Sequence, residues 1–530
     1  MDVEKVSIIR RRLKYAWGPF FARFGRLLPV QVETIPKILD GTNVVVASPT
    51  ASGKTEAVVA PVAERFRREQ WQGLAVLYIV PTRALANDTL ARIEGPLRDM
   101  GIKAVLKHGD KPYLPSDNLP NFLITTPESL DSLICRRPEA FGMLRTVILD
   151  EIHLLDNTYR GDQLRLLLWR LNKLVTDGTL SVHLLSATLS SPQQIAQRYV
   201  SNFEVVTVPG QRDIDYHLLS SLEEVTRLAR EQGWKKILCF CNLRESVEEV
   251  VDELAKLWHP YPVLAHHGSL ARRVREEAEA VMKEADVAAC VATSTLEIGI
   301  DIGDIDLIVL IEVPWSISSL LQRIGRGNRR EDVIHAAAIF KSDEEKFLLD
   351  AMFKVAAFGA LPEESYVPDL SVTIQQTFSL LYQNPQGVSE IVIRELLDPL
   401  CSEEEAKLIL GHLRRNGWIE WSAGRWFAST KLMDLGEKGR IHSNIQDSQT
   451  YRVIDIQSGK EIGIIAGVFD EVFVLAGRIW QVVSVEKDAI KVHRFKGKGL
   501  APLFQRHRNV GAFYWLLPSE LKAKNKKIAR

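Results

Sequence analysis

The chain lacks three features that would assign it to a class at once: a long apolar segment, a surplus of charge and a cysteine pattern. No apolar run reaches the roughly 20 residues that a membrane-spanning helix needs. The N-terminal residues are basic and amphipathic, without the apolar core of a signal peptide. We therefore expect an intracellular, cytoplasmic protein with no membrane partner.

Basic and acidic side chains balance, with 67 Lys and Arg against 67 Asp and Glu. Bulk charge therefore gives no reason to expect a nucleic-acid partner, and any such contact must come from local basic surfaces. The five cysteines, Cys135, Cys239, Cys241, Cys290 and Cys401, show no zinc-ligand spacing and are odd in number. This usage favours free thiols in a reducing compartment.

The composition that remains is that of an ordinary globular protein, 46% apolar and 25% charged. A length of 530 residues suits roughly three to four domains. Short apolar segments alternate with longer helical patterns, which is typical of a parallel sheet covered on both faces. These segments are 44–47, 74–80, 122–124, 147–149 and 182–185. Because ligands bind at the carboxyl ends of such strands, the polar motifs that follow them should gather at one edge.

A second alternating set, with apolar segments at 236–240, 287–292 and 307–311, predicts another α/β domain. From residue 370, helical patterns followed by a hairpin predict a winged helix. Short strands from 450 to 495 predict a small β-barrel-like domain. The fold class is therefore α/β, with two tandem parallel-sheet domains, a winged helix and a barrel. The predicted boundaries are 1–208, 209–362, 370–438 and 439–518, with a basic tail at 519–530.

The segment 48–55 has the pattern of a phosphate-binding loop, with Ser48 where Gly is usual. Backbone N–H groups of such a loop cradle phosphates at a helix N-terminus, and its lysine neutralises phosphate oxygens. The predicted cofactor-binding residues here are Thr50, Ser52, Gly53, Lys54 and Thr55. The cofactors are then ATP and Mg²⁺, with the Thr55 hydroxyl as a metal ligand. Gln31, upstream of the first strand, is a candidate to bind the adenine edge, although an exposed glutamine would need no such role.

Asp150 and Glu151 follow an apolar segment, where charges are costly to bury without a partner. Two acids after a strand also suit a helix N-terminus, but downstream of a phosphate loop they predict a catalytic pair. Asp150 would hold Mg²⁺, and Glu151 would orient or deprotonate the attacking water. His153, Ser186 and Thr188 are predicted to couple this pair to the second domain, although His153 could simply pack.

Gln322, Arg323, Arg326 and Arg329 recur at helical spacing, which places the arginines on one face, directed at an anion. The glycines between them weaken a plain surface helix, so a γ-phosphate is a fitting target. An arginine finger is worth roughly 10³–10⁵ in rate. We expect Lys54, Asp150, Glu151, Gln322, Arg326 and Arg329 to act in catalysis.

In this order the motifs resemble those of superfamily 2 helicases of the DExH type, which have two RecA-like domains. The matching segments are Gln31 for the glutamine motif, then 48–55, 150–153, 186–188 and 322–329 for motifs I, II, III and VI. Segments 81–83, 125–128 and 293–301 look like motifs Ia, Ib and V. A narrower resemblance is to the Lhr (large helicase-related) family, carried by segments 266–270, 297–301 and 439–445 and by the domain order.

The Lhr resemblance implies ATP-dependent 3′→5′ movement on single-stranded DNA. It also implies unwinding of DNA duplexes or RNA:DNA hybrids and a role in DNA repair. The motor motifs place strand contacts at Thr82, Arg83, Thr126 and Thr293, and such phosphate contacts position a strand without reading its sequence. The chain departs from the family at Asn328, where a small residue is usual, and we expect Arg329 rather than Arg330 to be the finger.

Trp418 and Trp421 are candidate stacking platforms, where a base is worth roughly 1–3 kcal/mol. The alternative is that these aromatic residues pack the core of the wing. The predicted partners are single-stranded DNA, a DNA duplex or an RNA:DNA hybrid, with a nuclease or other protein as a further candidate. Two other functions stay open: an RNA helicase, because the motor mainly touches phosphates, and a nucleic-acid-binding scaffold that needs a partner.

Overall fold

The computed structural model divides into two compact units, and each combines segments that are far apart in the sequence. Unit 1 contains the described parts of residues 3–208, 365–445 and 511–525, and unit 2 those of residues 213–357 and 450–495. The structure describes residues 3–48, 52–109, 119–176, 178, 180–186, 191–208, 213–297, 302–327, 333–357, 365–445, 450–466, 471–486, 488–495 and 511–525.

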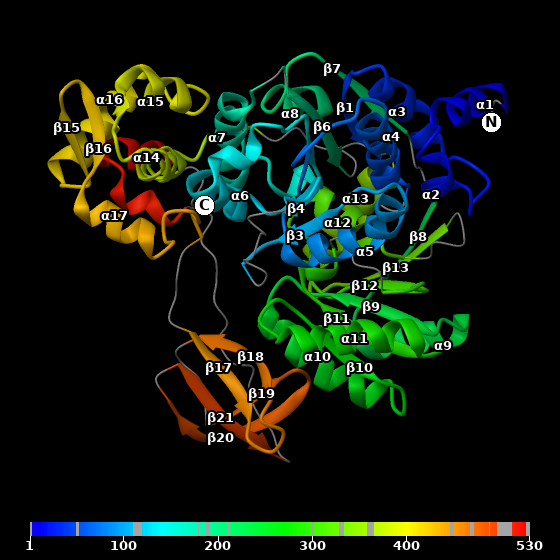
Figure 1. The fold of residues 1–530 in the computed structure, drawn as a ribbon. Coiled ribbons are helices and arrows are strands. Elements are labelled where there is room, and N and C mark those ends of the chain that lie inside the picture. Colours follow the sequence, from blue (N-terminus) through cyan, green and yellow to red (C-terminus); the bar gives the residue numbers. More distant parts are fainter. Residues whose placement is uncertain are drawn as a thin grey trace. The chain divides into compact units, whose positions relative to one another are not determined.

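Unit 1 is built around a seven-stranded sheet that is parallel throughout, as the apolar segments predict (Figure 1). In spatial order its strands are β3 (Ala104–Lys107), β4 (Phe122–Thr125), β2 (Val76–Ile79), β5 (Thr146–Leu149), β6 (Ser181–Ser186), β1 (Asn43–Ala47) and β7 (Phe203–Thr207). Val45 of β1 packs in a core cluster with helices α6 (Pro127–Arg136) and α7 (Tyr159–Leu174). Val44 and Val46 point to the opposite face and are equally buried, so both faces of the sheet are covered.

The helices on this sheet begin where the strands end. Helix α4 (Lys54–Arg68) follows β1, α5 (Arg83–Asp99) follows β2, and α6 follows β4, while α3 (Pro29–Leu39) precedes β1. The connections that carry the phosphate loop and motifs Ia and Ib therefore all start at the carboxyl edge of the sheet. Parallel strands put these ends together.

Unit 1 also contains the region predicted as a winged helix. Its elements follow the order α14 (Ser371–Gln383), β14 (Val388–Ser389), α15 (Glu390–Leu397), α16 (Glu403–Arg415), β15 (Ile419–Ser422), β16 (Arg425–Ala428) and α17 (Thr430–Glu437). The predicted hairpin is present, with Trp421 opposite Trp426. This region shares one apolar cluster with Leu166 of α7 and with Phe513 of the 3-10 helix η4 (Ala512–Leu516), which lies beside α14.

Unit 2 has a second parallel sheet, of six strands. In spatial order these are β10 (Val263–His266), β11 (Ala288–Ala292), β9 (Lys236–Phe240), β12 (Leu307–Leu310), β13 (Val333–Ile339) and β8 (Asp213–Leu219). Its helices include α10 (Arg244–Leu257), α11 (Arg272–Glu284), α12 (Ile317–Ile324) and α13 (Asp343–Ala357). The two α/β domains predicted from the apolar segments are thus both present.

The rest of unit 2 is a five-stranded curled sheet of mixed direction (Figure 1). In spatial order its strands are β18 (Glu461–Ala466), β17 (Thr450–Asp455), β21 (Ala489–Arg494), β20 (Arg478–Val485) and β19 (Val472–Leu475). Phe473 and Trp480 lie in the same apolar cluster as Cys239 and Val291 of the parallel sheet. The sequence assigns residues 439–518 to this domain, whereas its strands span 450–494, and residues 439–445 and 511–525 belong to unit 1.

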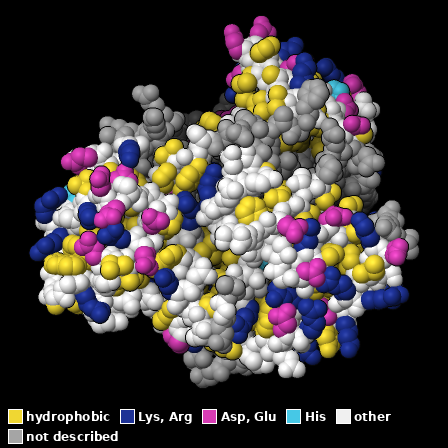
Figure 2. All heavy atoms as spheres, turned by 90° about the horizontal axis from the view of Figure 1, so that it is seen from above, with side chains coloured by type: hydrophobic (Ala, Val, Ile, Leu, Met, Phe, Trp, Pro, Cys, Tyr) yellow, Lys and Arg dark blue, Asp and Glu magenta, His cyan; other side chains and the backbone are white. Residues whose placement is uncertain are grey.

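Charges of both signs are visible on one face of the molecule (Figure 2). On the face drawn in Figure 2, Lys and Arg side chains are interspersed with Asp and Glu rather than separated into large areas of one sign.

All five cysteines are free thiols. Within the described ranges, no helix is both long enough and apolar enough to cross a membrane.

Candidate ATP site and strand-binding edge

The phosphate loop joins β1 to α4 and is held by contacts among its own residues. The Lys54 ammonium donates to the Ser48 carbonyl at 2.8 Å, and the hydroxyls of Ser48 and Ser52 are 2.6 Å apart. Gly53 precedes α4 with φ of +83°, in the left-handed region that glycine adopts without strain. The loop therefore presents Lys54 and Thr55 at the first turn of a helix, where backbone N–H groups favour an anion.

Gln31 lies against this loop from helix α3. Its side-chain oxygen accepts from the Leu28 N–H at 2.8 Å, and its side-chain nitrogen donates to the Gly53 carbonyl at 3.4 Å. A Cβ atom at position 53 would lie 2.6 Å from that nitrogen, so the close approach requires glycine. The structure thus shows Gln31 supporting the loop, and its predicted contact with adenine stays a prediction.

The acidic pair follows β5, at the same edge of the sheet. Asp150 and Glu151 are both buried, and the Glu151 N–H donates to the Asp150 carboxylate at 2.9 Å. Glu151 has φ of +45°, in the left-handed region, which costs a non-glycine residue about 1–3 kcal/mol and is typical of functional sites. Burial, and then the neighbouring charge of Glu151, raise the pKa of Asp150 to about 6.

Tyr78 is a site residue that the sequence analysis missed. Its hydroxyl donates to the Asp150 carboxylate at 2.6 Å and also bonds with the side chain of Thr55, so it joins the two predicted metal ligands. Burial and the Asp150 charge raise the pKa of Tyr78 well above its usual value. The available signal was a tyrosine inside the apolar segment 74–80, because a buried phenol needs a hydrogen-bond partner.

The oxygen atoms of this site fit Mg²⁺. The Thr55 hydroxyl and the Asp150 carboxylate are hard ligands of the kind this ion prefers. Two adjacent buried carboxylates repel each other, which contributes to the raised pKa of Asp150, so a dication would stabilise the ionised pair.

His153 connects the acidic pair to motif III. Its Nδ1 atom lies 3.0 Å from the Ser186 hydroxyl and 3.3 Å from a Glu151 carboxylate oxygen. Ser186 ends β6, where its carbonyl accepts from the Ser48 N–H at 3.3 Å. The structure therefore brings motifs I, II and III into one hydrogen-bonded chain, and their role in coupling stays a prediction.

The predicted strand contacts of unit 1 lie at the ends of adjacent strands. Thr82 caps helix α5 by accepting from the Leu85 N–H at 3.2 Å, and Thr126 precedes α6 and bonds with Glu128. The Arg83 side chain packs against Gly109, where a Cβ atom would lie 2.6 Å from its guanidinium. Because β2 and β4 are neighbours in the sheet, both threonines belong to one edge.

In unit 2, the arginines of motif VI hold motif V. Arg323 donates to the Glu297 carboxylate at 2.6 Å and to the Asn242 side chain at 2.9 Å, and Arg326 donates to the Glu297 carbonyl at 2.8 Å. Helix α12 ends at Ile324, so Gln322 is helical and Arg326 lies in the turn that follows. Thr293 is buried at the end of β11. Helical spacing alone did not show that Glu297 anchors both arginines.

The two tryptophans of the hairpin region differ in their surroundings. Trp418 packs against Phe378, with ring centroids 5.3 Å apart, and the Lys431 ammonium lies 3.5 Å from its ring centroid. Trp421 packs against the buried Trp426 in a tilted arrangement, with ring centroids 4.8 Å apart, and is 36% exposed. These contacts favour the core-packing alternative for Trp418 and leave Trp421 the better candidate for a base. Three further predicted site residues, Thr50, Thr188 and Arg329, lie outside the described residues.

The fold is that of two RecA-like domains, and each domain is similar to one half of a DEAD/DEAH-type helicase motor. Residues 28–195 match the DEAD/DEAH box helicase family, and residues 219–331 match the helicase conserved C-terminal domain. Among such helicases the chain is similar to the Lhr helicases, as segments 266–270, 297–301 and 439–445 predict.

The similarity to Lhr proteins extends over most of the chain. The ATP-dependent helicase Lhr-Core of Methanothermobacter thermautotrophicus is 28% identical over 531 residues, which cover 87% of this chain and 61% of that protein. The structure of Mycobacterium smegmatis helicase Lhr bound to ssDNA and AMP-PNP superposes with a TM-score of 0.71 at 25% identity, covering 82% of this chain and 62% of that one. The DNA-bound helicase MrfA gives a TM-score of 0.74 at 20% identity, covering 92% of this chain and 69% of that one, and shows the fold alone. The chain thus spans less than two thirds of the length of the Lhr-Core relative.

Proposed function

We propose that the chain is a nucleic-acid-dependent ATPase that moves 3′→5′ along single-stranded DNA and unwinds DNA duplexes or RNA:DNA hybrids, with a role in DNA repair. The observation that carries the ATPase is the connected set Lys54, Asp150, Glu151 and His153 at one sheet edge. Support for DNA as the strand comes from the Mycobacterium smegmatis Lhr structure, which is bound to ssDNA.

In this proposal, Lys54 neutralises phosphate oxygens, while Thr55 and Asp150 hold Mg²⁺, which supplies positive charge to the phosphates. The Glu151 carboxylate orients or deprotonates the attacking water. Arg326 and Arg329 are proposed to contribute positive charge to the γ-phosphate, with Gln322 beside them.

Strand binding is proposed at the edge that carries Thr82, Arg83 and Thr126 in unit 1 and at Thr293 in unit 2. These groups offer hydroxyls, a guanidinium and helix N-termini, which suit phosphates rather than bases. Affinity should then fall as salt rises. The same groups would accept RNA, so the choice between DNA and RNA has to be measured.

The test is ATP hydrolysis with and without single-stranded DNA and RNA of equal length and sequence, comparing wild type with Glu151→Gln. Because a positioned base contributes roughly 10²–10⁴ in rate, we expect DNA-stimulated hydrolysis to fall by at least about 10² in the variant. The matched control is Glu94→Gln, an exposed carboxylate on α5, which should keep the wild-type rate.

Each alternative has its own outcome in this assay. Stimulation by RNA alone would assign an RNA helicase, and hydrolysis that neither strand stimulates would favour a binding scaffold that needs a partner. Stimulation by DNA justifies an unwinding assay on duplexes with single-stranded tails, where 3′ tails should support unwinding and 5′ tails should not.

A further inference from the structure

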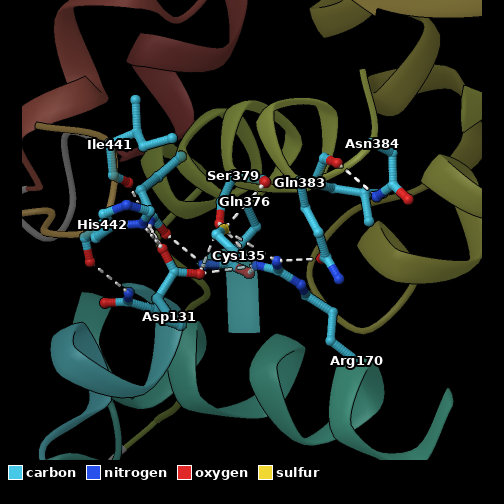
Figure 3. Close-up of polar contacts among 12 residues, drawn as sticks. Asp131, Cys135, Arg170, Gln376, Ser379, Gln383, Asn384, Ile441 and His442 are labelled. Carbon is cyan, nitrogen blue, oxygen red and sulfur yellow. Dashed lines mark hydrogen bonds and ion pairs between the residues drawn. The ribbon is translucent and has the colours of Figure 1, made fainter. Parts of the chain in front are cut away.

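A buried polar cluster joins helix α6 of the motor domain to helix α14 and to the segment 441–445 (Figure 3). At its centre, one Asp131 oxygen accepts from Arg170 at 2.8 Å, from Ser379 at 2.7 Å and from Gln376 at 3.1 Å. The other oxygen accepts from the His442 Nδ1 atom at 2.9 Å and from Gln375 at 3.3 Å. One fully buried carboxylate thus binds three separate parts of unit 1.

Arg170 of α7 makes further hydrogen bonds within this cluster. Its guanidinium also donates to the Ser379 hydroxyl at 2.8 Å, to the Gln383 side-chain oxygen at 2.7 Å and to the Cys135 sulfur at 3.4 Å. Asp131, Cys135 and His442 have metal-ligand chemistry, with ligand atoms within 4.8 Å of one another. The guanidinium already supplies the positive charge between them and occupies both the carboxylate and the thiol, so the cluster is an ion-pair centre and not a metal site.

The segment that carries His442 is fixed on both sides of the histidine. The Ile441 carbonyl accepts from Gln375 at 2.7 Å, and the His442 carbonyl accepts from Gln163 of α7 at 3.0 Å. Asn444 donates to the Ser371 hydroxyl at 2.9 Å and accepts from the Phe513 N–H at 3.1 Å. Segment 439–445 carried part of the Lhr resemblance without a chemical role, and its buried residues Ile441, His442 and Asn444 are those that contact the rest of unit 1.

Helix α6 gives this cluster a connection to the strand-binding edge. The helix begins directly after Thr126, and Asp131 lies just over one turn further along it. A rotation or shift of α6 would therefore displace Thr126. Replacing a whole buried ion pair by apolar residues often changes stability little, whereas removing one partner is costly, so a fully bonded cluster fixes one arrangement.

We propose that Asp131 and His442 are positioning residues for strand binding, which fix the orientation of α6, whose first turn follows the buried Thr126, relative to α14. The inference rests on the proposed function, because it requires a strand at this edge. Neither residue touches the strand, and both act through the orientation of α6 and α14.

The experiment compares His442→Ala, His442→Gln and Asp131→Asn with a control pair that spans similar elements at the surface. Lys173 of α7 and Glu395 of α15 form an ion pair at 3.3 Å with side chains 60% and 49% exposed. Glu395→Gln therefore removes a contact between the motor domain and the hairpin region without touching the cluster. An exposed pair of this kind contributes little.

Two readouts separate the inference from the proposed function. Binding of fluorescent single-stranded DNA, measured by anisotropy with a non-hydrolysable ATP analogue over a range of salt, tests positioning. Stimulated ATP hydrolysis tests the proposed function. Melting followed by circular dichroism shows which variants are folded at the assay temperature.

We expect His442→Ala to weaken DNA binding about tenfold, which is a loss of about 1.4 kcal/mol in binding free energy. It should also lower the salt dependence of binding. The KM for ATP should stay at the wild-type value. His442→Gln should recover part of the affinity, because its amide N–H can donate to Asp131. Glu395→Gln should bind as wild type does.

Wild-type affinity and salt dependence in folded His442→Gln and Asp131→Asn would overturn the inference, even where His442→Ala does not fold. An equal loss of DNA affinity in Glu395→Gln would also overturn the inference. Loss of any contact between the motor domain and the hairpin region would then weaken DNA binding, and the buried cluster would have no specific role. DNA binding without stimulated hydrolysis in the wild type would contradict the proposed function alone. Failure of the wild type to bind DNA or RNA would overturn both.

Discussion

Removing the Tyr78 hydroxyl is the most direct test of Mg²⁺ binding at this site. This hydroxyl bonds to both Thr55 and Asp150, and its hydrogen bond holds the pKa of Asp150 lower than burial alone would. Tyr78→Phe should raise the pKa of Asp150 above its value of about 6. The acidic limb of the ATPase pH profile should then move to higher pH, and the Mg²⁺ concentration for half-maximal rate should rise about fivefold, a loss of about 1 kcal/mol.

The matched control for this substitution is Tyr199→Phe. Tyr199 is also buried and donates to an aspartate, Asp156, at 3.0 Å, away from the phosphate loop. It should lower stability by a similar amount and leave the Mg²⁺ requirement and pH profile unchanged. Identical profiles for wild type and Tyr78→Phe would contradict the assigned role of Tyr78.

Among single residues, the sequence predicted those site residues whose side chains have few other uses at their positions. Lys54, Asp150 and Glu151 could be named because a cation in a glycine loop and two acids after a strand have specific uses. Tyr78 and Glu297 could not, because their roles depend on neighbours about seventy and twenty-six residues away. Trp418 shows the same limit, since only the structure places Phe378 and Lys431 against it.

Among the elements, the turn between β19 and β20 has an anchor that can be removed by one substitution. The Glu248 carboxylate of α10 accepts from the N–H groups of Ala476 and Gly477, both at 2.8 Å, and lies 2.9 Å from His267 Nε2. Glu248 is fully buried. Removing it leaves buried donors without an acceptor, at about 1–3 kcal/mol each.

We therefore expect Glu248→Ala to destabilise unit 2 by about 3 kcal/mol or more. Limited proteolysis should then release strands in the range 450–494 earlier than in the wild type. Glu249→Ala changes the exposed neighbour on the same helix and should stay within about 0.5 kcal/mol. Equal protease resistance of the two variants would show that the turn is held by other contacts.

The sequence predicted the positions of helices and strands better than the pairing of the strands. The apolar segments predicted strands β1, β2, β4, β5, β6, β9, β11 and β12 of the two parallel sheets, but not β3, β7, β8, β10 or β13. The strands at 450–494 were expected within a few residues. Strand order was not accessible, because pairings such as β17 with β21 join residues far apart in the chain. Helix α12 ends at Ile324, earlier than the arginine spacing suggested, because the glycines that follow it end the regular hydrogen bonding.

On the scale of a whole unit, the cluster around His442 predicts how stability depends on pH. Burial alone would lower the pKa of His442, but its hydrogen bonds with Asp131 and Cys135 raise it from 6.5 to about 9. The groups that face it are Asp131 and Cys135 of α6, Arg170 of α7 and the Tyr382 ring of α14. Because the pKa of His442 is raised in the folded state, its protonated form stabilises unit 1 fully below pH 6.5. This stabilisation is lost as the pH rises through about 9.

Unit 1 should therefore lose stability between pH 6.5 and pH 9, on the order of 3 kcal/mol. The pKa of Asp131 is lowered despite its burial, chiefly by His442 and Arg170, so its own contribution is lost only in acid. Hydrogen exchange of the α14 amides, taken as the ratio of wild type to His442→Gln at each pH, isolates the histidine. A ratio that stays constant over this range would contradict the ion pair.

The course of the chain through the two units has a consequence for biosynthesis. The polypeptide passes between the units four times, so the order in which residues leave the ribosome differs from the order in which each core is completed. The apolar cluster around Phe378 in unit 1 also needs Phe513, which emerges only after all the strands of unit 2 have been made. A nascent chain stalled between these two residues exposes an unfinished apolar face, and we expect such products to be bound by chaperones or degraded rather than released as working halves.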